Sequence, residues 1–99
     1  MSKLVIDKVS LGWAKKHRSD LLKRGYTKIE EVGKDLQEDI SDYDLALYCK
    51  TDDCNLVTMD KRAFAACFKA GIKRVEIELL GWDETTKEKR PVLLIRYNH

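Results

Sequence analysis

The chain of 99 residues has no strong excess of either charge. Its 19 lysines and arginines are nearly matched by 17 aspartates and glutamates, which leaves a net charge of +2. The composition therefore excludes a global positive field of the kind that attracts nucleic acid. Any nucleic-acid partner would need a local basic patch.

Long apolar runs and targeting signals are also missing. No stretch approaches the roughly 20 apolar residues that span a bilayer, and the N-terminus lacks the pattern of a signal peptide. We therefore expect a cytoplasmic protein with no membrane partner. A hydrophobic content of 43% argues against disorder, and this length suffices for one domain, over residues 1–99, but not for two.

Cysteine patterns typical of disulfide frameworks or zinc sites are absent. Three cysteines, an odd number, in a chain without a secretory signal indicate reduced thiols. Cys49 and Cys67 fall on the apolar faces of expected helices, where a free cysteine behaves as a small hydrophobe. A metal site built on Cys49 and Cys54 has no second CxxC or HxxxH to complete it, so packing is the favoured interpretation.

What the chain does contain is an alternation of apolar strands and amphipathic helices. Strands are predicted at 3–7, 26–32, 56–59, 75–79 and 92–97, and helices at 10–25, 41–50 and 61–70. This order predicts a three-layer α/β/α sandwich with a mainly parallel sheet and a C-terminal hairpin.

Short polar residues and glycines mark the ends of the predicted helices. Ser41, followed by Asp44 three residues later, resembles a capping box, so a helix should begin there with Asp42 in its first turn. Ser10 is the expected cap of the first helix. Gly25 and Gly71 are the expected C-terminal stops.

Three aspartates fall where a buried strand ends or a helix begins. Asp7 and Asp60 follow apolar strands, and Asp42 starts a helix. Because the functional crevice of an open parallel sheet lies outside the carboxyl ends of its strands, we expect these side chains to meet there. Like charges so close repel one another unless a divalent cation neutralises them, and all-oxygen ligation suits Mg²⁺ or Mn²⁺. Each aspartate also has a structural interpretation, as a helix cap or a turn residue.

The segments VID at 5–7, SD at 41–42 and LVTMDK at 56–61 resemble the successive motifs of PIN-like domains, especially the short, minimal branch. The resemblance covers roughly residues 3–80, although each motif is short. PIN domains are typically Mg²⁺- or Mn²⁺-dependent ribonucleases, and many are the toxin of a toxin and antitoxin pair. The resemblance implies that Asp7, Asp42 and Asp60 are catalytic metal ligands. It also implies that Thr58 is a supporting hydroxyl and that single-stranded RNA is the substrate.

Two cations stand where members of that family often carry acids. Lys8 follows the first aspartate directly, and Arg62 lies two residues after Asp60. Asp44 is the candidate replacement for one missing acid, and Lys8, Lys61 and Arg62 are candidate phosphate contacts. Two functions remain open: an endoribonuclease, or a catalytically silent PIN-like module that binds RNA or a protein partner.

More distant expectations concern other classes and partners. A phosphoacceptor signalling domain also places acids at strand ends, but it needs an acidic pair after the first strand and five βα units. The toxin resemblance implies an antitoxin protein as a partner. Trp82, beside the hairpin tip, is the candidate for a homodimer contact.

Overall fold

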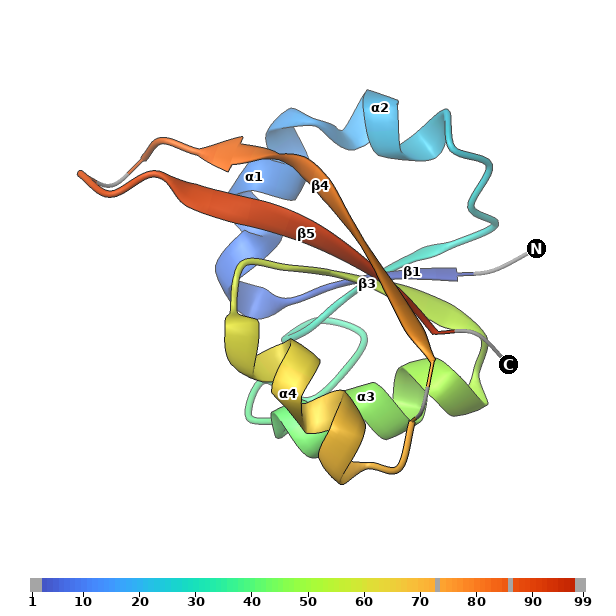
Figure 1. Cartoon of the computed structure of the whole chain (residues 1–99). Helices are drawn as coiled ribbons and strands as arrows, with labels where there is room; N and C mark the ends of the chain where they lie inside the picture. Colours follow the sequence, from blue (N-terminus) through green and yellow to red (C-terminus); the bar gives the residue numbers. More distant parts are fainter. Residues whose placement is uncertain (1–2, 73, 86, 98–99) are drawn as a thin grey trace.

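The computed structural model describes residues 3–72, 74–85 and 87–97, and within them five strands form one mixed sheet in the order β2-β1-β3-β5-β4 (Figure 1). The strands are β1 (Lys3–Ile6), β2 (Ile29–Glu31), β3 (Cys54–Thr58), β4 (Val75–Asp83) and β5 (Arg90–Tyr97). β1 pairs in parallel with β2 and β3, whereas β5 is antiparallel to both β3 and β4. The expected parallel pairing is thus confined to the first three strands, and the expected hairpin is present as β4 and β5.

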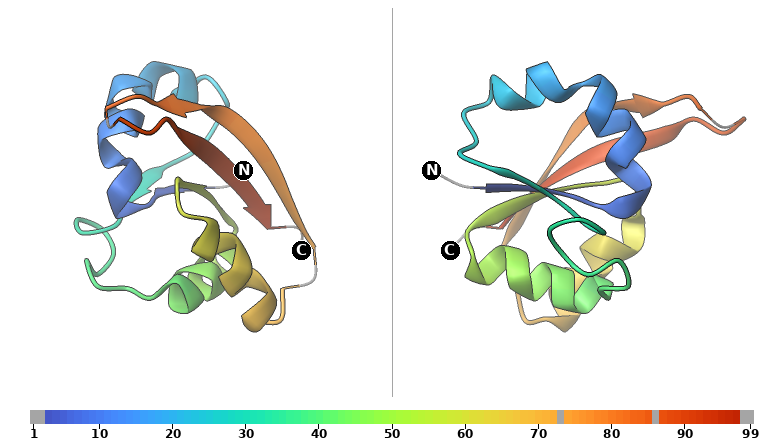
Figure 2. Two further views of the ribbon diagram at one scale, coloured as in Figure 1. Left: turned by 60° about the vertical axis from the view of Figure 1, so that its left-hand side comes forward. Right: turned by 180° about the vertical axis from the view of Figure 1, so that it is seen from behind.

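The helices lie on both sides of this sheet (Figures 1 and 2). They are α1 (Leu11–Lys16), α2 (Arg18–Leu22), α3 (Asp42–Thr51) and α4 (Lys61–Lys69), with a 3₁₀ turn η1 (Lys8–Ser10) before α1. Alternate residues of the strands join two apolar clusters, because successive side chains of a strand point to opposite faces. One cluster contains Leu4, Ile6, Val57 and Leu94 with Trp13 and Leu21 of α1 and α2. The other contains Val5, Leu56 and Ile95 with Leu45 and Cys67 of α3 and α4.

The segment predicted as one helix from Ser10 to Gly25 is broken at His17, so that prediction is wrong. The imidazole of His17 stacks on Trp13 with the ring centroids 4.0 Å apart, and its Nδ1 lies 2.9 Å from the Trp13 carbonyl oxygen. The imidazole therefore shares the Trp13 carbonyl with the backbone amide of His17, which lies 3.2 Å from the same oxygen, and the helix restarts at Arg18. Ser10 does not cap α1, since its buried hydroxyl has no hydrogen-bond partner among the described residues.

Other predicted helix ends are confirmed. The Ser41 hydroxyl accepts a hydrogen bond of 3.0 Å from the Asp44 amide at the start of α3. Gly25 and Gly71 have φ values of 89° and 78°, the left-handed conformation that ends helices at low cost for glycine. These ends fix where α3 begins, and with it the position of Asp42.

The three cysteines lie within one apolar cluster of the described chain. Cys49, Cys54 and Cys67 are all buried and free, which agrees with the packing interpretation. Among the residues that the structure describes, every helix is too short or too polar to cross a membrane.

Candidate functional site

The carboxyl ends of β1 and β3 are joined through a buried hydroxyl. Thr58, the last residue of β3, is fully buried, and its Oγ1 donates a hydrogen bond of 2.9 Å to Oδ2 of Asp7. The same oxygen accepts a bond of 3.1 Å from the amide of Asp60. Thr58 therefore holds the first aspartate beside the backbone of the third, although the two are far apart in sequence. The Lys8 amide also donates to Oδ1 of Asp7, at 2.7 Å, so this carboxylate caps η1.

Asp60 has a structural role as well as a place in this cluster. Its Oδ1 accepts a hydrogen bond of 2.9 Å from the Arg62 amide, which caps α4. The Arg62 guanidinium folds back on the same carboxylate, with Nε at 3.2 and 3.1 Å from the two oxygens. These hydrogen bonds hold the pKa of Asp60 below its usual range, and the charge of Arg90 at the start of β5 adds to the effect.

Asp42, the first residue of α3, brings a third carboxylate to this place. Burial raises its pKa, and the negative charges of Asp60 and Asp7 raise it further, while Arg62 opposes them. The side chain of Asp42 makes no hydrogen bond within the described residues. We call Asp7, Asp42 and Asp60 the acid cluster, because all three lie close enough for their charges to interact.

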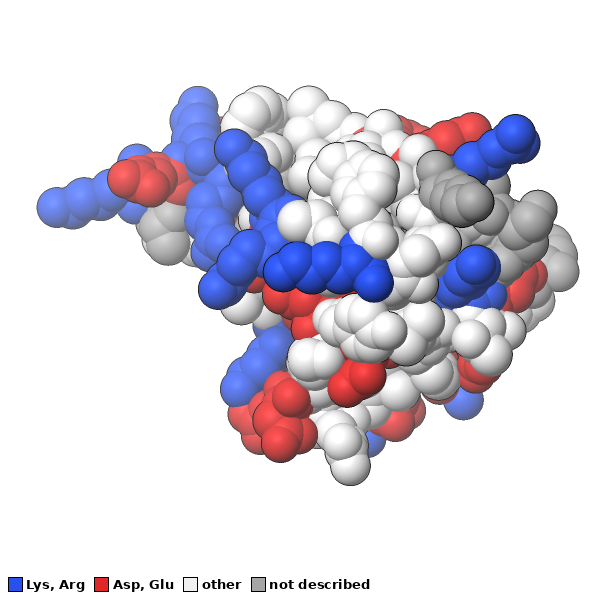
Figure 3. Space-filling view, turned by 60° about the horizontal axis from the view of Figure 1, so that its bottom comes forward, with Lys and Arg blue, Asp and Glu red and all other residues white. Residues whose placement is uncertain are grey.

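The remaining sequence-predicted residues lie around the cluster and not within it. Lys8 forms an ion pair with Glu38 in the loop before α3, and both side chains are exposed. Lys61 and Asp44 are exposed, and neither is among the charges that shift the pKa of Asp42. On the face seen in Figure 3, which brings the lower side of Figure 1 forward, acidic atoms lie directly beside lysine and arginine side chains.

Two of these neighbours were missed by sequence reasoning. Glu38 and Arg90 belong to none of the sequence motifs that pointed to the aspartates. Neither carries a local pattern that links it to the aspartates, because each approaches through the tertiary fold. The one usable signal is the presence of Lys8 and Arg62 close to the aspartates, although these cations were predicted to contact phosphate.

The acid cluster is not arranged as a ligand set. Within residues 3–72, 74–85 and 87–97, no group of three or more His, Cys, Asp or Glu side chains is placed to hold a metal ion. Two of the carboxylates already accept hydrogen bonds. Asp7 accepts them from Thr58 and from the Lys8 amide. Asp60 accepts them from Arg62. The donor chemistry is all oxygen and suits a hard cation, but Arg62 covers part of it.

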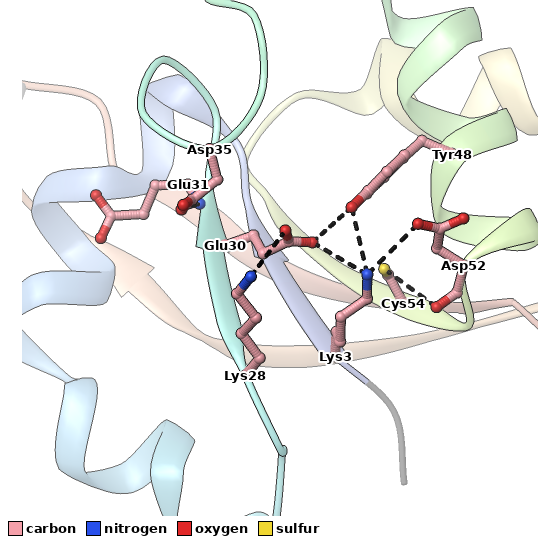
Figure 4. Close-up of polar contacts among 8 residues, drawn as sticks. All are labelled: Lys3, Lys28, Glu30, Glu31, Asp35, Tyr48, Asp52 and Cys54. Atoms are coloured by element: carbon pink, nitrogen blue, oxygen red, sulfur yellow. Dashed lines mark hydrogen bonds and ion pairs between the residues drawn. The ribbon is translucent and has the colours of Figure 1, made fainter.

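A second polar cluster lies at the amino ends of β1 and β3 (Figure 4). We call Lys3, Lys28, Glu30, Tyr48 and Asp52 the amino-end network. The Tyr48 hydroxyl donates a bond of 2.7 Å to Glu30, whose side chain is only 9% exposed. Lys3 Nζ lies 3.4 Å from carboxylate oxygens of both Glu30 and Asp52, and Lys28 Nζ lies 3.7 Å from Glu30.

Opposite charges alternate through this network. The hydrogen bond to Glu30, together with burial, raises the pKa of Tyr48 to about 12, so Tyr48 remains a donor. The hydrogen bond with Tyr48 raises the pKa of Lys3, so this side chain remains a cation. Tyr48 therefore keeps its proton and Lys3 its charge at neutral pH, which is the pattern of a structural cluster.

Comparison of the chain with family models, with curated proteins and with solved structures gives no match.

Proposed function

We propose that this protein is a metal-dependent ribonuclease of the PIN-like type, built as a three-layer α/β/α sandwich, which hydrolyses phosphodiester bonds of single-stranded RNA at the acid cluster. The observation that carries the proposal is the convergence of Asp7, Asp42 and Asp60 from three separate elements, with two of them raising the pKa of the third. Structural clusters pair opposite charges, and an excess of like charge in a crevice is typical of functional sites.

Mg²⁺ or Mn²⁺ fits the donor set once Arg62 moves. The Arg62 side chain is 83% exposed, and ion pairs in such exposed positions contribute little because water and salt screen them. A divalent cation near Asp60 therefore competes with a weakly held guanidinium. Asp7, Asp42 and Asp60 would hold the metal, which supplies an activated water and stabilises the charge that develops on the phosphate.

The protein's own groups would position the reacting parts. Thr58 holds one oxygen of Asp7 and thereby fixes the direction of the other. Arg62, once released from Asp60, can donate to a phosphate oxygen in bidentate fashion, which suits its planar guanidinium. Lys8 and Lys61 are exposed cations that directly follow Asp7 and Asp60 in the sequence, and they would be the further phosphate contacts.

Cleavage of a labelled single-stranded RNA in the presence of Mn²⁺ tests the proposal. Asp7→Asn and Asp60→Asn should each reduce cleavage by at least about 100-fold, because each removes a ligand charge. Asp44→Asn is the matched control, since this exposed carboxylate lies on the same helix turn as Asp42 but outside the cluster. Full activity in either cluster variant, or equal loss in the control, would refute the assignment.

A catalytically silent PIN-like module that binds RNA or a protein partner is the second candidate. It is favoured by the pairing of Arg62 with Asp60, which neutralises one of the three acids. Titration with Mn²⁺ separates the two functions: no binding at millimolar concentration supports the silent module. Binding that strengthens in Arg62→Ala supports the nuclease, because the competing cation is gone. An antitoxin partner, a homodimer through Trp82 and a cytoplasmic location remain predictions.

A further inference from the structure

A cavity of about 420 Å³ lies between α1, α2 and the β1–β2 side of the sheet. Its walls are mainly apolar and include Ile6, Leu11, Leu21 and Ile29. This volume falls within the range of roughly 300–1,000 Å³ that is usual for sites of small organic ligands. The cavity is thus large enough for a compact apolar group and is suited to burying one.

Three charged side chains line the same cavity, namely Lys15, Arg18 and Glu31. No hydrogen bond or ion pair among the described residues engages any of their charged groups. Glu31 points away from its neighbour Glu30, on the side of β2 that faces α1 (Figure 4). Glu30 forms ion pairs with two lysines, whereas none of the described residues forms one with Glu31.

The cavity is separate from the acid cluster. Ile6 belongs to the apolar cluster of α1 and α2. Thr58, which holds Asp7, follows Leu56 in the alternation of β3 and so faces the side of α3 and α4. A ligand in the cavity would therefore lie across the sheet from the proposed nuclease site, and its binding does not depend on that proposal.

The charges of the lining define the ligand. A simple carboxylate would satisfy Lys15 and Arg18 but would be repelled by Glu31, and a simple amine would have the reverse fault. A molecule that carries both charges next to an apolar body satisfies all three side chains and fills the apolar volume. We propose that this cavity binds an apolar α-amino acid, with its carboxylate held by Lys15 and Arg18 and its ammonium group held by Glu31.

Calorimetric titration with three matched probes tests the proposal. L-Phenylalanine carries both charged groups, 3-phenylpropionate lacks the amine, and phenethylamine lacks the carboxylate. We expect phenylalanine to bind at least about tenfold more tightly than either analogue, because each missing group leaves a charged partner unpaired. Serine, which has the same charges without the apolar body, should not bind measurably.

Variants assign the binding to the cavity. Glu31→Gln should weaken the binding of phenylalanine about tenfold, and it should leave the binding of 3-phenylpropionate unchanged or tighter. The double variant Lys15→Met and Arg18→Met should also weaken the binding of phenylalanine, but it should leave the binding of phenethylamine unchanged or tighter. Lys16→Met is the matched control on the same helix, since Lys16 does not line this cavity. Circular dichroism checks that each variant is folded. The proposal is overturned if phenylalanine fails to bind at millimolar concentration, if phenylpropionate binds equally well, or if the control loses as much as the cavity variants.

Discussion

The two ends of the central strands carry polar clusters of opposite design. At the amino ends, Glu30 accepts from Tyr48 and contacts two lysines, so each buried charge has a partner of opposite sign. At the carboxyl ends, three aspartates share one place, and Asp42 is driven toward its protonated form. The difference indicates that the first cluster stabilises the fold. At the second, burial and the charges of Asp60 and Asp7 disfavour the ionised form of Asp42, which costs stability at neutral pH.

The largest expected effect comes from breaking the amino-end network. Glu30→Gln removes a nearly buried charge and leaves Lys3 with fewer partners, so the free energy of unfolding should fall by about 1–3 kcal/mol. Urea denaturation followed by circular dichroism measures it. Glu31→Gln is the matched control on the same strand, and it should change stability by less than about 0.5 kcal/mol because none of the described side chains pairs with its carboxylate. Equal effects in the two variants would show that the network adds no stability.

A smaller effect of opposite sign is expected at the acid cluster. A carboxyl whose pKa is raised by folding binds its proton more tightly in the folded state. Stability is therefore lost as the pH rises from the ordinary aspartate value of 3.8 through the raised value of Asp42. The Asp42→Asn variant should not show this loss. When the pH is raised from 3 to 7, its free energy of unfolding should therefore rise by roughly 0.5 kcal/mol relative to that of the natural protein. Urea denaturation at both pH values measures the difference, and an unchanged difference would contradict the repulsion.

The smallest expected effect is that of salt. The Debye length shortens from about 10 Å at 0.1 M to about 3 Å at 1 M, so salt should weaken the repulsion among the partly exposed aspartates more than the contacts of buried Glu30. When salt is raised from 0.1 M to 1 M, the free energy of unfolding of the natural protein should increase by about a few tenths of a kcal/mol, and that of Asp42→Asn should increase by less. Thermal unfolding in sodium chloride measures both. An identical gain in the two proteins would place the salt effect elsewhere in the molecule.

Much of the fold could be predicted because its signals are local. Runs of apolar residues located β1, β3 and β5, and the Ser41 cap and the φ-positive Gly71 located helix ends. Strand order was not predictable in the same way. The antiparallel insertion of β5 beside β3 depends on contacts between distant residues, such as Leu56 with Ile95, which no local pattern encodes.

The candidate site was predictable to the extent that strand ends meet at one edge of a sheet. That rule located Asp7 and Asp60, and the capping pattern located Asp42. The rule could not predict which cations contact those carboxylates, since the direction of the Arg62 side chain and the approach of Arg90 depend on the folded surroundings. The amino-end network was missed for a related reason. Glu30 carries no local pattern that predicts its burial, yet its side chain is only 9% exposed and accepts a hydrogen bond from Tyr48.

The position of β5 has a consequence for the newly made chain. β3 leaves the ribosome well before β5, which later covers one of its edges. During that interval the apolar strand presents unpaired amides and carbonyls, the surface through which nascent chains associate with one another. The free edge of β3 can therefore be paired within the sheet only after the β4–β5 hairpin has been made.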